Sequence, residues 1–242
     1  MCDIMVESIW QVSASQKQLC GMVKTQGVEL LDSLVAEYGK VMVVMGHRGN
    51  WEMVGPFCGE KELRSKESFA NYPITVTYKK ARSRISNFLF EKMRMHEYEK
   101  FGNTGHIVGS KQVLRHVAKG EGKHTYLFIA DQYPRLGGVP VRFLNQNTFF
   151  FEGAEFMARK LNLPVVYLDM AREKRGCYRI TFSLICKNSK ESGRGEITLA
   201  YAGLLEKHIK ENPYNWLWSH KRWKRGFTLQ EQQECNELCG RA

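Results

Sequence analysis

Short runs of apolar residues alternate with amphipathic segments along most of the 242-residue chain. The apolar runs have the length of buried strands, and the amphipathic segments have the three-to-four-residue spacing of helices that cover a sheet. We therefore predict strands at residues 39–45, 73–78, 106–108, 125–130, 141–144, 165–170 and 178–186, and helices at residues 3–14, 28–37, 51–58, 81–98, 110–119, 153–161 and 197–211. This alternation predicts an α/β fold with a mainly parallel central sheet covered by helices on both faces.

The chain shows no repeat and no linker rich in proline, glycine and serine, so we expect a single domain over residues 1–242. Its apolar fraction of 43% is enough for a full core. Within this domain we expect residues 1–35 to form a helical N-terminal segment and residues 226–242 to form a flexible or helical tail.

Polar side chains follow three of the predicted strands. In parallel sheets, ligands bind beyond the carboxyl ends of the strands. His47, Tyr78 and Asp131 each lie at such an end. We expect them to converge on one site if their strands are neighbours in the sheet.

The most reactive of these positions is His47, in the run Gly-His-Arg-Gly-Asn-Trp-Glu at residues 46–52. The two glycines predict a turn, and Asn50 suits the N-cap of a following helix. Glu52 would then lie in the first helical turn, where the helix dipole favours an ionised carboxylate. This arrangement suits a general base, His47, held by its partner Glu52. The alternative is a loop histidine beside a helix cap, because short motifs discriminate weakly.

The run at residues 46–52 resembles the signature Gly-His-x-Gly-Asn-Trp-Glu of the bacterial late acyltransferases of lipid A biosynthesis, a family of the lysophospholipid-acyltransferase superfamily. Further matches follow in the family's order. They are Asp-Gln at 131–132, Gly-Gly-Val at 137–139, Val-Arg-Phe-Leu at 141–144, Glu-Gly-Ala at 152–154, Leu-Pro-Val-Val at 163–166 and Trp-Leu-Trp-Ser-His-Lys-Arg-Trp-Lys at 216–224. The resemblance runs from about residue 36 to 225 and implies the glycerolphosphate acyltransferase-like fold.

The same resemblance implies an O-acyltransferase that moves a fatty acyl chain from an acyl thioester to a hydroxyl of a lipid A precursor. His47 would be the general base and Glu52 its partner. The donor would be acyl–acyl carrier protein or acyl-CoA, with no other cofactor and no metal. Candidates for oxyanion stabilisation or substrate binding are Gly49, Asn50, Trp51, Lys79, Asp131, Gln132 and Arg142.

Several of these residues also have an ordinary structural interpretation. Asp131 suits the cap of a turn, and Arg142 suits a surface ion pair as well as a substrate phosphate. Lys79 stands where the family often has arginine, and lysine lacks the forked guanidinium. His220 and Arg222 would contact a phosphate or brace the core, and bracing is the stronger interpretation.

The net charge of +11 favours an anionic partner. Cations cluster at residues 78–84 and 220–225, and the expected partners are acyl carrier protein, an anionic lipid or lipid A precursor, and a membrane surface. The first alternative is a related acyltransferase that acts on another glycolipid, an aminolipid or a lysophospholipid. The second is a non-enzymatic basic protein that binds membranes or nucleic acid. Since the chain has no nucleic-acid-binding motif, nucleic acid is not a predicted partner, and the oligomeric state stays open.

No apolar run reaches the length of a membrane-spanning helix, whereas the family usually begins with a hydrophobic anchor. We expect a peripheral enzyme at the cytoplasmic face of the bacterial inner membrane, or a soluble one if the anchor is absent. Seven scattered cysteines favour a reducing compartment over a disulfide framework. Cys235 and Cys239 lie one helical turn apart but lack the further ligands of a zinc site.

Overall fold

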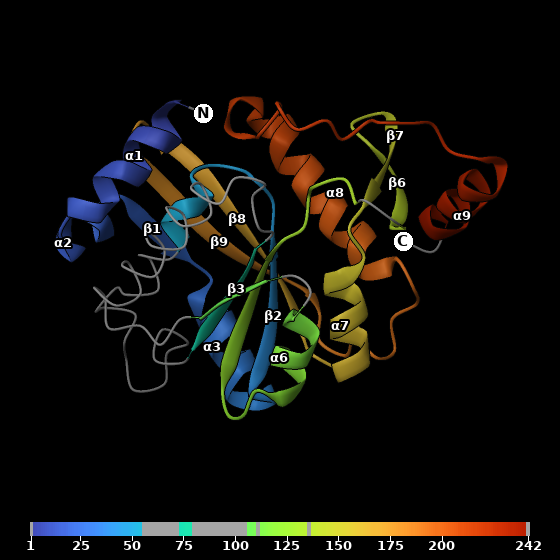
Figure 1. The fold of residues 1–242 in the computed structure, drawn as a ribbon, viewed down its shortest axis with the longest axis horizontal. Helices are drawn as coiled ribbons and strands as arrows, with labels where there is room; N and C mark the ends of the chain where they lie inside the picture. Colours follow the sequence, from blue (N-terminus) through green and yellow to red (C-terminus); the bar gives the residue numbers. More distant parts are fainter. Residues whose placement is uncertain (1, 55–72, 79–105, 110–111, 135–136, 241–242) are drawn as a thin grey trace.

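A computed structural model describes residues 2–54, 73–78, 106–109, 112–134 and 137–240 (Figure 1). Within these ranges, seven strands form one central sheet. Their order across the sheet is β1 (Val23–Gln26), β9 (Cys177–Cys186), β8 (Val165–Lys174), β2 (Lys40–Met45), β5 (His124–Ile129), β3 (Ile74–Tyr78) and β4 (His106–Gly109). Every neighbouring pair is parallel except β8 and β9. The predicted α/β fold with a mainly parallel sheet is confirmed.

Helices pack on both faces of this sheet. One face carries α1 (Cys2–Ser13), α2 (Gln16–Cys20) and α3 (Val28–Tyr38), and the other carries α6 (Val113–Lys119), α7 (Gly153–Leu161) and α8 (Glu196–Glu211). The central strand β2 has Met42 and Val44 in one core and Val41 and Val43 in the other. Burial on both faces explains its continuous apolar sequence. No helix in the described ranges is both long and apolar enough to cross a bilayer.

A separate hairpin lies outside the central sheet. Its strands β6 (Val139–Phe143) and β7 (Gln146–Phe150) are antiparallel, and the helix α9 (Leu229–Cys239) packs on β6. Leu144 and Asn145 at the turn both have positive φ, as a tight two-residue hairpin turn requires. The strand predicted at residues 141–144 therefore belongs to this hairpin and not to the parallel sheet, because so short a turn permits only antiparallel pairing.

The sequence patterns did not predict two of the strands. β1 has only four residues and no apolar run, and β7 begins with three polar residues. The helix predicted at residues 51–58 is described only as far as Val54, and its start is the 3₁₀ turn η1 (Trp51–Met53). The helix predicted at residues 81–98 lies outside the described residues. A second 3₁₀ turn, η4 (Pro213–Asn215), follows α8.

Candidate active site

The carboxyl ends of β2 and β5 lie side by side, because the strands are parallel and Met45 pairs with Ile129. β3 lies on the other side of β5. β2, β5 and β3 are therefore neighbours in the sheet. They lead to His47, Asp131 and Tyr78, so the condition for convergence on one site is met.

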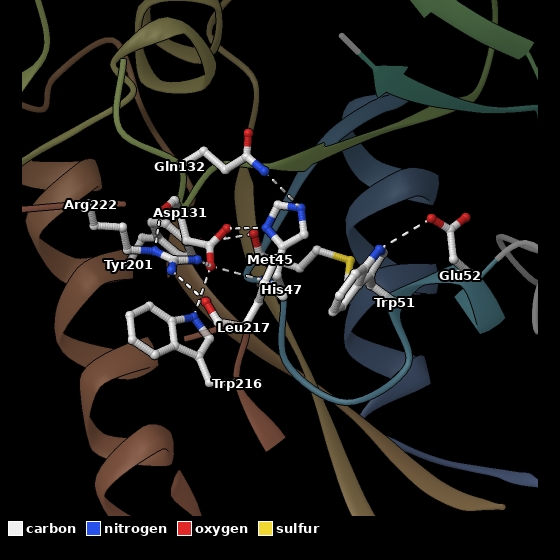
Figure 2. Close-up of polar contacts among 10 residues, drawn as sticks. All are labelled: Met45, His47, Trp51, Glu52, Asp131, Gln132, Tyr201, Trp216, Leu217 and Arg222. Atoms are coloured by element: carbon white, nitrogen blue, oxygen red, sulfur yellow. Dashed lines mark hydrogen bonds and ion pairs between the residues drawn. The ribbon is translucent and has the colours of Figure 1, made fainter. Parts of the chain in front are cut away.

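His47 follows β2, and its imidazole ring is held by Asp131, which follows β5 (Figure 2). Nδ1 of His47 lies 2.5 Å from Oδ1 of Asp131, and the backbone N–H of His47 donates to Oδ2 at 3.1 Å. When Nδ1 carries the proton shared with Asp131, Nε2 is left as an acceptor. The side-chain nitrogen of Gln132 lies 3.4 Å from this Nε2. The His47 side chain is 12% exposed, so the ring is accessible from solvent.

Asp131 is buried and surrounded by donors. Its Oδ2 accepts from Trp216 Nε1 and from Arg222 Nη2, both at 2.9 Å, and its backbone carbonyl accepts from Arg222 Nε at 2.9 Å. Burial by itself would raise the pKa of Asp131. The charge and hydrogen bond of His47, together with Arg222, outweigh that effect and hold the pKa of this carboxyl well below its usual range. The ionised carboxylate stabilises a positive charge on the His47 ring.

Arg222 and Trp216 brace the carboxylate from the segment after α8. The guanidinium carbon of Arg222 lies 3.9 Å from the centre of the Trp216 ring, and its Nη1 donates to the Leu217 carbonyl at 2.6 Å. These contacts support the bracing interpretation of Arg222. Burial, followed by the charge of Arg222, lowers the pKa of His220 from 6.5 to about 4, so its ring is neutral at pH 7.

Two glycines allow the loop after β2 to fit against its neighbours. A Cβ on Gly46 would lie 2.7 Å from Cδ1 of Leu205, and a Cβ on Gly49 would lie 2.4 Å from the Met170 carbonyl oxygen. Gly49 also has a φ of +65°, in the left-handed region that favours glycine. Gly49 therefore requires the absence of a side chain, and a side chain at Gly46 would have to displace Leu205.

The loop is fastened to the segment around η4 by backbone hydrogen bonds. The N–H of Gly49 donates to the Asn215 carbonyl at 2.7 Å, and the N–H of Leu217 donates to the His47 carbonyl at 3.0 Å. Gly49 was a predicted oxyanion donor, but its N–H is already engaged by Asn215. This pairing holds the backbone of His47 between β2 and the C-terminal segment.

A buried ion pair fastens the same loop to β8. Nη1 of Arg48 lies 2.5 Å from Oδ2 of Asp169, and both side chains are less than 10% exposed. Asp169 also accepts from the Tyr167 hydroxyl at 3.2 Å, and its Oδ1 lies 3.3 Å from Nδ1 of His208. Burial would raise the pKa of Asp169, but the hydrogen bond with His208 and the charge of Arg48 lower it overall.

Asn50 is buried and joins the loop to α1. Its Oδ1 accepts from the N–H of Glu52 at 3.3 Å, which makes it the predicted N-cap, here of η1. Its Nδ2 donates to Oε2 of Glu7 at 2.7 Å, and the hydroxyl of Tyr178 donates to the same oxygen at 2.6 Å. The inner side of α1 is thus hydrogen-bonded to the residue three positions after His47.

The sequence pattern predicts that Glu52 holds the His47 ring, and the structure differs. The Glu52 carboxylate accepts from Trp51 Nε1 at 3.2 Å, and in Figure 2 it lies on the far side of Trp51 from His47. The Trp51 and His47 rings pack edge to face with centroids 4.8 Å apart. The turn that begins at Asn50 thus places an indole between the two side chains, and Asp131 takes the contact with Nδ1.

Another predicted residue, Arg142, does not join the cluster around His47. Arg142 is exposed on β6, because its neighbours Val141 and Phe143 point into the core. Lys79 lies outside the described residues. Among the described residues, no three side chains of the metal-ligating types gather in one place.

A cavity of about 240 Å³ opens beside the loop. Its walls come from the N-terminal end of α1, from Gly49 and Trp51, and from the segment at residues 214–219. Arg172 and Tyr178 complete the lining, so the cavity combines aromatic surface with a cation.

Sequence reasoning missed Glu7 and Asp169 as supports of the loop. Asp169 carried a usable signal, because a carboxylate within the apolar run at residues 165–170 requires a buried partner. Glu7 carried none, since an acidic residue on an amphipathic helix is ordinarily exposed.

A solvent-accessible histidine held by a buried carboxylate at the carboxyl edge of a parallel sheet is typical of an enzyme that uses a general base. The family model described as bacterial lipid A biosynthesis acyltransferase matches residues 1–225, and the chain belongs to this family. The family implies acyltransferase activity in lipid A biosynthesis. A search of the curated proteins found no match to the chain.

Proposed function

We propose that this protein transfers a fatty acyl chain from an acyl thioester to a hydroxyl of a lipid A precursor, with His47 as the general base. The observation that carries the proposal is the 2.5 Å contact between His47 Nδ1 and Asp131 Oδ1. It leaves Nε2 as the atom that accepts a proton. Family membership supports the acyl-transfer chemistry.

In the proposed reaction, His47 Nε2 takes the proton of the acceptor hydroxyl while the hydroxyl oxygen bonds to the thioester carbonyl carbon. The tetrahedral intermediate then expels the thiolate as the carbon–sulfur bond breaks. The imidazolium returns the proton to the sulfur. Asp131 favours the imidazolium through its charge and its hydrogen bond to Nδ1.

The developing oxyanion needs a donor close to Nε2. We assign this role to the side-chain amide of Gln132, because its nitrogen lies 3.4 Å from Nε2. Asn50 and Trp51, which the sequence placed among the oxyanion candidates, are proposed to shape the loop around His47. Glu52 is proposed to hold the Trp51 indole, to which it is hydrogen-bonded.

The donor is proposed to be acyl–acyl carrier protein, with acyl-CoA as the alternative. A net charge of +11 favours an acidic carrier protein as well as an anionic lipid acceptor. We propose that the reaction takes place at the cytoplasmic face of the inner membrane, where the enzyme is peripheral.

The test is transfer from radiolabelled acyl–acyl carrier protein and from acyl-CoA to a panel of acceptors. The panel contains a lipid A precursor, another glycolipid, an aminolipid and a lysophospholipid. Transfer to the lipid A precursor is expected, and His47→Ala should reduce it by at least about 10²-fold. A thermal unfolding curve for each variant checks that it is folded.

Equal transfer by a folded His47→Ala variant would place the base elsewhere. Transfer to a different lipid would keep the chemistry and correct the acceptor. A folded wild-type protein that acylates none of the acceptors from either donor would overturn the proposed function.

A further inference from the structure

The outward side of α1 is apolar. Met5, Val6 and Ile9 are 62%, 63% and 68% exposed, whereas Glu7 and Gln11 on the inward side are buried. This reverses the ordinary pattern of a surface helix, which turns its polar side to water. An exposed apolar patch of this kind is typical of an interaction site.

Two exposed aromatic residues lie beside the same end of α1. Tyr214 and Trp218 are 92% and 49% exposed, and they line the cavity together with Asp3 and Ile4 of α1. Figure 1 shows the N-terminal end of α1 close to the segment that follows α8. Tyrosine and tryptophan combine an apolar ring with a polar group and are enriched where proteins meet lipid headgroups.

Cations border this patch at the β8–β9 turn. Arg172 and Arg175 both contact the carboxylate of Asp3, each at 2.9 Å, so two positive charges share one negative charge. Residues 172–179 carry four arginines and lysines and one glutamate. The turn therefore keeps an excess of positive charge next to the N-terminal end of α1.

We propose that these three parts form one lipid-docking surface, defined by Met5, Val6 and Ile9, by Tyr214 and Trp218, and by the β8–β9 turn. Its partner is an anionic lipid bilayer. The apolar side chains would enter the headgroup region, and the arginines would contact lipid phosphates. The inference deepens the proposed function and rests on it only for the identity of the acceptor.

The lipid-docking surface reaches the loop that carries His47. The cavity between α1 and residues 214–219 reaches Gly49 and Trp51 in the loop that carries His47. On its inward side, α1 is hydrogen-bonded to the same loop through Glu7 and Asn50. A docked bilayer would therefore face the cavity mouth, and a lipid acceptor would reach the loop from the bilayer surface.

The test is co-sedimentation of the whole chain with phosphatidylcholine vesicles that contain or lack phosphatidylglycerol. We expect stronger binding to the anionic vesicles. Combined Met5→Ser, Val6→Ser and Ile9→Ser should weaken that binding by about tenfold or more. Arg175→Gln should weaken binding to anionic vesicles by about fivefold and leave binding to neutral vesicles unchanged.

Phe156→Ser is the matched control, since Phe156 is half exposed on α7, which packs on the opposite face of the sheet. It should bind vesicles like the wild type. If the triple variant is poorly folded, Ile9→Ser alone replaces it in the test. We expect this single variant to lose part of the binding to anionic vesicles. His47→Ala should bind fully, so a failure of the catalytic proposal is distinguishable from a failure of docking.

The proposal would be overturned if the wild-type protein does not bind anionic vesicles, or if a folded triple variant binds them as well as the wild type does. A wild-type dimer that the triple variant converts to a monomer, measured by light scattering without lipid, would also overturn it. That result would assign the apolar side of α1 to a second copy of the chain.

Discussion

Nδ1 of His47 and Oδ1 of Asp131 lie 2.5 Å apart although 84 residues separate them in the sequence. The contact exists because β2 and β5 are adjacent parallel strands that end at the same edge of the sheet. Each residue follows the last residue of its strand by two positions. The sheet order therefore creates the pair on which the proposed chemistry depends.

Replacement of the carboxylate tests this pair. Asp131→Asn should lower kcat on the order of 10³-fold with little change in KM, because an amide neither carries the charge nor selects the same ring tautomer. Steady-state transfer kinetics measure both parameters. Unfolding curves must accompany them, since Arg222 loses its ionic partner in this variant. An unchanged kcat in a folded variant would contradict the pairing.

Glu52→Gln should have a much smaller effect than Asp131→Asn. The glutamine oxygen can still accept the hydrogen bond that Trp51 Nε1 gives to Glu52 at 3.2 Å. We expect a loss of kcat below about tenfold, which corresponds to one modest hydrogen bond. The comparison uses the same transfer assay for both variants. If Glu52→Gln loses as much activity as Asp131→Asn, the Glu52 charge takes part in the reaction.

Replacement of Gly49 by alanine should destabilise the protein, whereas the same replacement at Gly203 should not. Gly49→Ala would place a methyl group 2.4 Å from the Met170 carbonyl at a φ of +65°, and we expect a loss of more than about 1 kcal/mol in the free energy of unfolding. Gly203→Ala is the control, because Gly203 lies in α8 with nothing within 4 Å of an added Cβ. It should gain up to about 1 kcal/mol. Urea titration compares the two, and equal effects would contradict the strain argument.

The buried pair between Arg48 and Asp169 should behave non-additively. Arg48→Met leaves the Asp169 carboxylate buried beside His208 and the Tyr167 hydroxyl but without the charge of Arg48, at an expected cost of roughly 3–5 kcal/mol. The double variant Arg48→Met with Asp169→Leu removes both charges and should be more stable than Arg48→Met alone. A double-mutant cycle by urea unfolding measures the coupling. Losses that simply add would show that the two side chains act independently.

The lowered pKa of His220 should make the stability of the protein depend on pH. Burial, then the charge of Arg222, lowers the pKa of His220 to about 4 in the folded chain, below the ordinary 6.5. The unfolded chain therefore binds a proton at His220 more readily than the folded chain does. The contribution of the neutral ring to the free energy of unfolding is fully present above about pH 6.5 and is lost as the pH falls toward about 4. Between about pH 7.5 and pH 5, wild type should lose more free energy of unfolding than His220→Asn. Equal losses would mean that His220 titrates alike in both states.

Local sequence determined the elements and the character of the loop. The apolar run of β2, the helix α7 and the N-cap Asn50 follow from patterns spanning only a few residues, because periodicity and capping are local properties. The same patterns placed His47 at a strand end. The family signature identified the chemistry that this position supports.

Only the tertiary structure decided which carboxylate holds His47. Glu52 is five positions away, but the turn places Trp51 between them, whereas Asp131 arrives through strand pairing. The partners of the loop, Glu7 and Asp169, are likewise distant in sequence. The physical reason is that the order of strands in a sheet depends on the packing of the whole chain, and no local pattern carries that information.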